Sequence, residues 1–150
     1  MVTTAAKALL VDTSVLLEAS NRARRQHTAA LSLLEQHNQL VFPAQVAREF
    51  LVVATRPPEV NGLGLTSRAA LESLTAFRRN VRLLPEEKPL LPTLLRLVEE
   101  LSIVGKRVHD AHIVAAAVVH RVKAVVTLNG DDFRAFGAQV RCVTPADATG

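Results

Sequence analysis

The sequence is poor in residues on which several classes of protein depend. Cys142 is the only cysteine, so the chain can form no internal disulfide and no cysteine-based zinc site. Tryptophan and tyrosine are absent and phenylalanine is sparse, which leaves no broad aromatic surface for stacking single-stranded bases. No apolar run approaches the roughly 20 residues of a membrane-spanning helix, and the first residues contain no secretory apolar segment. We therefore expect a soluble, cytoplasmic protein.

The overall charge favours an anionic partner only mildly. The chain has 150 residues, a formal net charge of +4 and a sequence pI near 10.0. This length predicts a single domain over residues 1–150. If the protein binds nucleic acid, charge should dominate the contact. Solvated surface charge with no anionic partner explains the same composition equally well.

Short apolar runs alternate with segments of helical periodicity along the whole chain. This alternation predicts an α/β fold: a three-layer α/β/α sandwich around a mainly parallel sheet of four to five strands. The expected strands are residues 8–11, 40–42, 81–84 and 124–127, with a short edge strand at 140–143. The expected helices are residues 14–19, 28–37, a helix opened near Pro43, 66–79, 94–101 and 111–122. Residues 56–64 are expected to form an irregular surface loop because they are rich in proline and glycine.

Three acidic residues occupy positions where solvated carboxylates are not expected. Asp12 ends an apolar strand, Asp110 stands at the start of an apolar helix, and Glu49 shares a helical face with Val46 and Val53. A buried carboxylate is costly unless it is paired, protonated or bound to a metal. Several such groups at the ends of buried elements indicate convergence on a hard cation, and carboxylates without cysteine favour Mg²⁺ or Mn²⁺ over zinc.

Each acid also has a purely structural explanation. Asp12 could cap the following helix, and Asp110 could be only a first-turn acid that the helix dipole stabilises. Glu49 could pair with Arg48 or Arg56, although Arg48 is adjacent in sequence and points elsewhere on a helix. All of these structural explanations would have to be true at once for the sequence to need no shared acidic site.

Four segments in this order resemble the motifs of PIN-domain ribonucleases. They are residues 10–16 (LVDTSVL), 46–50 (VAREF), 108–116 (VHDAHIVAA) and 127–133 (TLNGDDF). The resemblance spans roughly residues 8–143, and the compact chain is most similar to the VapC toxins of VapBC toxin–antitoxin pairs. It implies the PIN-like fold and RNA cleavage that leaves a 5′-phosphate and a 3′-hydroxyl. It also implies a homodimer that a VapB-like antitoxin blocks.

The resemblance assigns roles to residues of the four motifs. Asp12, Glu49 and Asp110 are the expected catalytic acids. The fourth contribution comes from Asp132, Asp131 or the amide of Asn129, with Asp132 and Asn129 ranked ahead of Asp131. The expected metal ligands are Asp12, Glu49, Asp110, Asn129 and Asp132.

Further residues are expected around this site. Ser14 and Thr127 could position a metal-bound water or a phosphate, and Ser14 is expected to contact the site in preference to Thr13. The basic residues expected to bind flanking RNA phosphates, or else to be solvated surface charge, are Arg24, Arg25, Lys106 and Arg107.

Three rival functions remain open at this stage. His109 and His112 lie three positions apart and could form an acid–base pair for metal-free RNA cleavage. Asp12 could be the nucleophile of a phosphatase or dehalogenase, although no second Asp follows two residues later. A catalytically silent domain that binds RNA or protein is the alternative from outside the enzymes.

Overall fold

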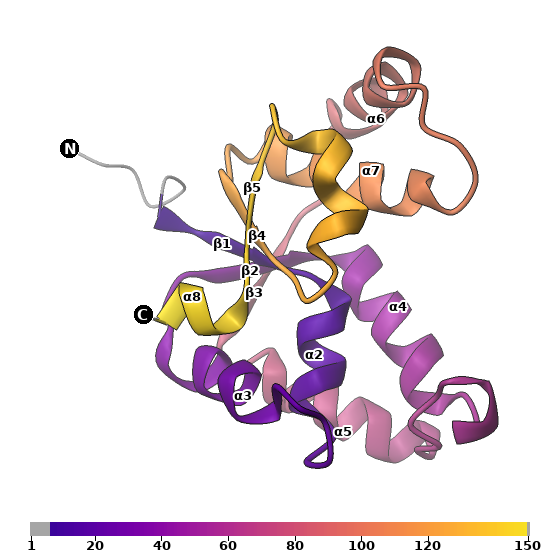
Figure 1. Cartoon of the computed structure of the whole chain (residues 1–150), viewed down its shortest axis with the longest axis vertical. Helices are drawn as coiled ribbons and strands as arrows, with labels where there is room; N and C mark the ends of the chain where they lie inside the picture. Colours follow the sequence, from indigo (N-terminus) through magenta and orange to yellow (C-terminus); the bar gives the residue numbers. More distant parts are fainter. Residues whose placement is uncertain (1–6, 150) are drawn as a thin grey trace.

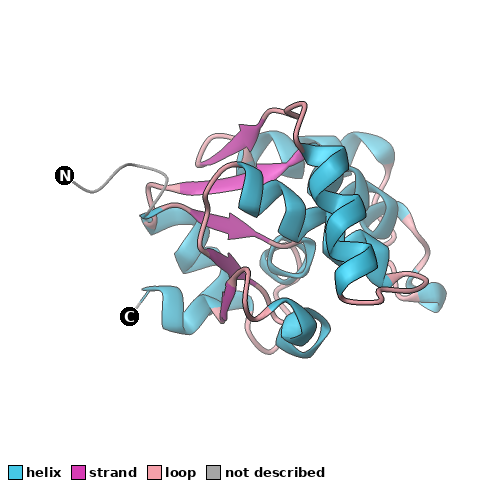
Figure 2. Cartoon of the chain, turned by 90° about the horizontal axis from the view of Figure 1, so that it is seen from above, coloured by secondary structure: helices cyan, strands magenta, loops and turns pink. Residues whose placement is uncertain are grey.

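A computed structural model describes residues 7–149 and is built around a five-stranded parallel sheet (Figures 1 and 2). The spatial order of the strands is β3-β2-β1-β4-β5, and every neighbouring pair is parallel. The strands are β1 (Leu9–Val11), β2 (Leu40–Pro43), β3 (Val81–Leu84), β4 (Ala124–Val126) and β5 (Arg141–Val143). The predicted fold class and all five predicted strands are confirmed, with β3 and β5 at the edges.

The strands are short apolar runs because helices cover both faces of the sheet. All residues of β2 and β4 are buried, and β1 is buried apart from partial exposure of Leu9. Aromatic packing supports the surrounding helices: the rings of Phe50 and Phe77 meet edge to face with their centroids 5.6 Å apart. The sheet is therefore a rigid frame for side chains at the strand ends.

Two helical layers enclose the sheet, with α6 and α7 on one face and α2, α3 and α5 on the other (Figure 1). Helix α4 packs on α2 and α5. The helices are α2 (Thr13–Ala19), α3 (His27–Gln36), α4 (Ala44–Thr55), α5 (Ser67–Phe77), α6 (Leu90–Glu100), α7 (Arg107–Val119) and α8 (Pro145–Thr149). Two 3₁₀ segments, η1 (Pro58–Val60) and η2 (Gly130–Phe136), complete the described elements. No helix within residues 7–149 is both long and apolar enough to cross a bilayer.

Several element boundaries differ from the predicted ones. Helix α6 begins four residues earlier than expected, with Pro92 in its first turn, where a missing amide donor costs little. The loop 56–64, expected to be irregular, contains the turn η1. Helix α7 begins at Arg107, which places Asp110 in its first turn. Helix α8 was not predicted because its five residues lack an apolar periodicity.

The strand order reverses direction at the centre of the sheet. From β1 the chain moves outward to β2 and β3, and then returns to the other side of β1 as β4 and β5. In doubly wound parallel sheets, sites form outside the carboxyl ends of the strands at this switch point. Asp12 follows β1 and Thr127 follows β4, so both lie at the switch.

Candidate active site at the carboxyl edge of the sheet

Asp12 is fixed at the switch point by hydroxyl groups. Its side chain retains only 6% exposure. Oδ2 accepts hydrogen bonds from Thr127 Oγ1 at 2.8 Å and from Ser14 Oγ at 3.0 Å. Asp12 stands at the N-cap position of α2, yet its side chain makes no capping hydrogen bond, so helix capping does not explain this acid. Burial raises the pKa of Asp12 above its usual 3.8, and the two hydroxyl hydrogen bonds offset part of that rise.

The hydroxyls of Ser14 and Thr127 are themselves held by the backbone. Ser14 Oγ accepts from the amide of Leu128 at 3.1 Å, and Thr127 Oγ1 accepts from the amide of Asn129 at 2.9 Å. Each hydroxyl is therefore oriented to donate toward Asp12. The sequence predicted that Ser14 and Thr127 would position a water or a phosphate, whereas their contacts in this structure are with the carboxylate.

Glu49 reaches the same edge from α4. Its Oε2 accepts from Thr13 Oγ1 at 3.0 Å, and its Oε1 accepts from Gln45 Nε2 at 2.6 Å. The pairing with Arg48 or Arg56 that would explain Glu49 structurally is not among the ion pairs within residues 7–149. Ser14 contacts the site as expected, through Asp12, and Thr13, over which Ser14 was preferred, also reaches it through Glu49.

Gln45 is a second residue that sequence reasoning missed. Its Nε2 also donates to the backbone oxygen of His109 at 2.8 Å, and its side-chain oxygen is buried without a hydrogen-bond partner among the described residues. Gln45 thus ties Glu49 on α4 to the start of α7. Its position four residues before Glu49, on the same helical face, was the available signal.

Two adjoining cavities bring the acids together. The smaller, of about 270 Å³, is lined by Asp12 among others, and the larger, of about 550 Å³, opens beside α4 and α7. Both cavities share four lining residues, and these are Thr13, Glu49, Asp110 and Asp132. The structure therefore brings the four predicted catalytic acids to one edge of the sheet.

Asp110 carries the clearest electrostatic sign of this convergence. Its pKa is raised from 3.8 to about 6, first by burial and then by the charges of Asp132, Asp12 and Glu49. The charge of Arg107 lowers the pKa of Asp110 by less than these effects raise it. Carboxylates that repel one another across a cavity are the usual surroundings of a bound metal ion or of a functional proton.

The candidates for the fourth acidic contribution occupy different surroundings. Asp132 lines both cavities and Asn129 lines the smaller one. Asp131 lines neither and forms an exposed ion pair with Arg134. The geometry is consistent with ranking Asp132 and Asn129 ahead of Asp131.

The oxygen-only donors fit a hard divalent cation in chemistry and charge. Within residues 7–149, no three Asp, Glu, His or Cys side chains form a complete metal cluster by themselves. Mg²⁺ usually keeps several water ligands and binds one or two carboxylates directly, so an incomplete ring of protein ligands suits it. Asp12 supports this fit, because its buried carboxylate has only neutral hydroxyl hydrogen-bond donors.

Basic residues rim the acidic cavities unevenly. Arg24 lines the smaller cavity and forms an ion pair with the buried Glu18 at 3.7 Å. Lys106 and Arg107 line the larger cavity, whereas Arg25 lines neither. Two further arginines of the larger cavity, Arg48 and Arg56, were considered in the sequence only as partners of Glu49.

The histidine pair does not share one cavity. His109 is exposed and lines the larger acidic cavity. His112 instead lines a separate cavity of about 30 Å³ together with His120, and burial lowers its pKa. The two imidazoles therefore lack the common target that the rival metal-free mechanism needs.

The reversal of strand order and the acids collected beside it define a doubly wound α/β domain with a carboxylate-lined cleft at the switch point. The chain belongs to the PIN domain family, whose profile matches residues 9–139. Proteins called "Ribonuclease VapC48", from two strains of Mycobacterium tuberculosis, are 32% identical over 139 residues, which cover 87% of this chain and 93% of theirs.

Solved structures with the same fold are more distant in sequence. A chain of the VapBC2 structure from Rickettsia felis superposes with a TM-score of 0.68 at 16% identity, covering 91% of this chain and 98% of its own. A chain of VapBC-1 from nontypeable Haemophilus influenzae gives 0.67 at 12% identity, with 92% and 98% covered. These likenesses establish the fold.

Proposed function

We propose that this protein is a metal-dependent endoribonuclease and the toxin of a toxin–antitoxin pair. The observation that carries the proposal is the meeting of Asp12, Glu49, Asp110 and Asp132 at two adjoining cavities. Membership of the PIN family and the relatives named as VapC ribonucleases support the same activity for this chain.

The proposed metal is Mg²⁺, with Mn²⁺ as a substitute. Asp12, Glu49, Asp110, Asp132 and Asn129 would hold it. When bound, a divalent cation activates a water molecule and neutralises charge that develops on the scissile phosphate. The roles of the chain's own residues follow from their contacts.

Asp12 is the central anchor of the proposed reaction. The hydroxyls of Ser14 and Thr127 hold its carboxylate in one orientation at the switch point. Thr13 and Gln45 do the same for Glu49 on the neighbouring helix. Because these acids are already oriented before the reaction, little free energy is spent on reorganising them in the transition state. This preorganisation accelerates the reaction.

The proton of the attacking water needs an acceptor in the cavity. Asp110 is one acid of the cavity that could take that proton; its pKa of about 6 belongs to the metal-free site, and a bound cation would favour its charged form. Lys106 and Arg107, at the start of α7, lie on the wall of the same cavity and can bind phosphates that flank the cleaved bond.

Partners are proposed on the same basis. The structural neighbours come from VapBC structures, and this supports a VapB-like antitoxin as the natural inhibitor. A homodimer and a cytoplasmic location accord with the family resemblance and with the single cysteine.

The test compares Asp12→Asn with the matched control Asp147→Asn, which removes an exposed carboxylate of α8 far from β1 in sequence. Labelled RNA and Mg²⁺ are supplied, and the fold is followed by circular dichroism. We expect Asp12→Asn to lose cleavage while staying folded and the control to match the wild type. Cleavage by folded Asp12→Asn at the wild-type rate would overturn the proposal. RNA binding without cleavage by the wild type would favour the catalytically silent alternative.

A further inference from the structure

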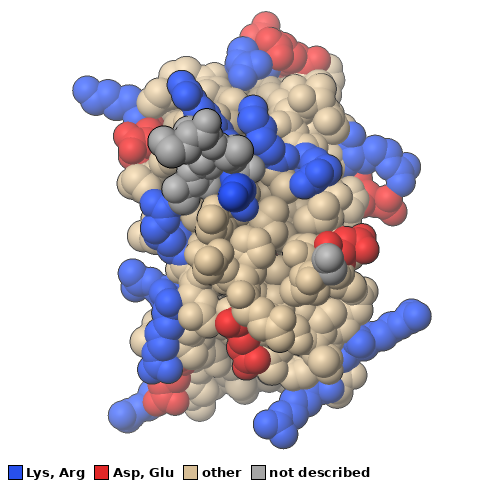
Figure 3. Space-filling view, turned by 90° about the vertical axis from the view of Figure 1, so that its left-hand side faces the viewer, with Lys and Arg blue, Asp and Glu red and all other residues tan. Residues whose placement is uncertain are grey.

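The end of the sheet at which the strands start, opposite the acidic cavities, carries an excess of positive charge; we call it the basic edge. The strand register aligns Leu9, Leu40, Val81, Ala124 and Arg141 in one row at the strand starts. Exposed basic residues flank this row, and they are Lys7, Arg78, Arg79, Arg82, Arg121, Lys123 and Arg141. In the view onto this side, lysine and arginine side chains gather in the upper part and along the margins, with some acidic side chains between them (Figure 3). The acids of the proposed site thus lie at the strand ends with basic residues on their rim, whereas this row at the strand starts is flanked by basic residues.

None of these basic residues is neutralised by an ion pair within residues 7–149. The ion pairs of that region use Arg24, Arg68, Arg96 and Arg134 instead. Clustered and unpaired guanidinium groups repel one another, and a bound anion relieves this repulsion. The charge of this edge is therefore available to a ligand.

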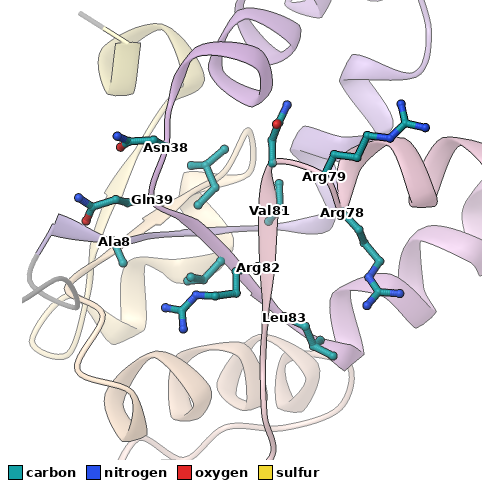
Figure 4. A pocket seen from close by; sticks show the side chains of 11 residues that line it. Ala8, Asn38, Gln39, Arg78, Arg79, Val81, Arg82 and Leu83 are labelled. Atoms are coloured by element: carbon teal, nitrogen blue, oxygen red, sulfur yellow. The ribbon is translucent and has the colours of Figure 1, made fainter.

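A pocket of about 700 Å³ lies within this basic edge, between the starts of β2 and β3. Figure 4 shows Gln39 and Arg82 on one side of β3, with Arg78 and Arg79 beyond the strand on the other. No acidic residue lines the pocket. Its volume lies within the range of about 300–1,000 Å³ that is typical of ligand sites.

The pocket also offers hydrogen bonding beyond charge. The side-chain oxygen of Gln39 is buried without a partner among residues 7–149. Asn38 and Asn80 add two more amide side chains to the lining. A matching ligand therefore carries anionic groups for the arginines and hydrogen-bonding groups for the exposed amides of Asn38 and Asn80. RNA offers both, as phosphates and as 2′-hydroxyls or base amines.

A surface groove leads away from this pocket along α5. The groove has a volume of about 600 Å³ and shares Arg79 with the pocket. At the other end of α5, the loop from Arg56 leads back to the larger acidic cavity, which Arg56 also lines. A helix of this length spans roughly 16 Å. A strand that joins the pocket to the acidic cavity must therefore span at least the length of this helix and the loop before it.

We propose that the Arg78–Arg79–Arg82 pocket is a second RNA-binding site, remote from the cleaved bond, which holds the backbone of the substrate. The inference rests on the proposed ribonuclease function for the identity of the ligand. The remote site selects long RNA over short fragments, because only a long strand reaches both edges of the sheet. An RNA strand held at both the pocket and the acidic site also binds more tightly than one held at a single site, because the second contact is intramolecular.

The test uses the Asp12→Asn protein, so that bound RNA is not cut. Binding is measured for a uridylate strand of about 40 nucleotides and for one of about three, which at 3.4 Å per nucleotide is roughly 10 Å long and too short to span α5. The test variant adds Arg78→Ala, Arg79→Ala and Arg82→Ala. The control adds Lys88→Ala, Arg96→Ala and Arg134→Ala, which remove the same charge outside the pocket and the groove.

We expect the test variant to bind the long strand at least about tenfold more weakly than the control. The slope of log K against log salt should fall by about 2, as three lost phosphate contacts predict. Binding of the short strand should match the control. If the triple variant does not fold, Arg79→Gln and Arg82→Gln replace it singly, each with an expected two- to fivefold loss.

Equal binding of the long strand by test and control variants would overturn the proposal. So would retention of RNA binding together with lost binding of an acidic protein partner, which would reassign the pocket to protein recognition. Failure of the proposed function is a separate result. In that case the wild type would not cleave RNA, while arginine-dependent binding of the long strand would persist.

Discussion

The hydroxyl of Thr127 donates a 2.8 Å hydrogen bond to Asp12 Oδ2, although the two residues lie 115 positions apart in the sequence. The bond crosses from the end of β4 to the end of β1, two strands that are neighbours in the sheet. It fixes the orientation of the buried acid on which the proposed active site depends.

Replacement of Thr127 by valine tests this relationship. Thr127→Val keeps the shape but leaves Asp12 and the amide of Asn129 without their hydroxyl partner. We expect a loss of about 1–3 kcal/mol in the free energy of unfolding and a fall of at least about tenfold in RNA cleavage. Thr127→Ser is the matched control and should restore both. Equal cleavage by the valine and serine variants would contradict the positioning role.

The pH dependence of stability tests the environment of Asp110. Its pKa is raised in the folded protein from 3.8 to about 6, so the folded state binds the proton more tightly than the unfolded state does. The associated stability is fully present below about pH 4 and is lost as the pH rises through 6. Asp110→Asn should therefore stabilise the metal-free protein at pH 7.5, by about 1 kcal/mol after allowance for solvent screening.

Chemical denaturation in EDTA at two pH values measures this effect. The gain from Asp110→Asn should largely disappear at pH 4.5, where most wild-type Asp110 is already neutral. Asp131→Asn, at an exposed acid outside both cavities, should show no such pattern. A pH-independent difference between wild type and Asp110→Asn would show that the carboxylate is not destabilised by its surroundings.

Gln45 is expected to act through Glu49. Gln45→Ala removes the hydrogen bonds to Glu49 Oε1 and to the backbone of His109. We expect weaker Mg²⁺ activation of cleavage, seen as a several-fold higher Mg²⁺ concentration for half-maximal rate, with little change in the maximal rate. A purely structural role would instead lower stability and leave the Mg²⁺ requirement unchanged.

The basic rim predicts a difference between two adjacent arginines. Arg24 lines the smaller acidic cavity and Arg25 does not. In the Asp12→Asn background, Arg24→Ala should weaken RNA binding several-fold and reduce its salt dependence, whereas Arg25→Ala should have a smaller effect. Filter binding across a salt series measures both. Identical behaviour of the two variants would assign the RNA contact to general surface charge.

Much of the fold was predictable because its signals are local. Strands buried on both faces appear as short apolar runs. Thr66 or Ser67 is the kind of residue that caps a helix start, and the Thr66 side chain accepts a hydrogen bond from the amide of Ala69 at the N-cap of α5. The beginning of α6 was misjudged because Pro92 resembles a break in the sequence, although a first-turn proline is tolerated. Helix α8 has too few residues to show a period.

The acids were predictable, and their supporting contacts were not. Asp12, Glu49 and Asp110 are visible as charges in apolar surroundings, a local property of the sequence. The contact of Thr13 with Glu49 joins residues 36 positions apart, and Gln45 meets the backbone 64 positions away. Such partners depend on the packing of α2, α4 and α7, which one sequence does not specify.

The basic pocket illustrates the same limit. Arg78, Arg79 and Arg82 follow one another closely in the sequence, and this spacing alone does not indicate a pocket. Their alignment with Gln39 depends on the register between β2 and β3. Only that register creates a pocket without acids at the edge opposite the active site.

Cleavage of labelled RNA with and without divalent cation tests the central claim most directly. The wild type should be inactive in EDTA, recover when Mg²⁺ is returned in excess, and saturate with Mg²⁺, while folded Asp12→Asn stays inactive throughout. Undiminished cleavage by the wild type in EDTA would contradict the account.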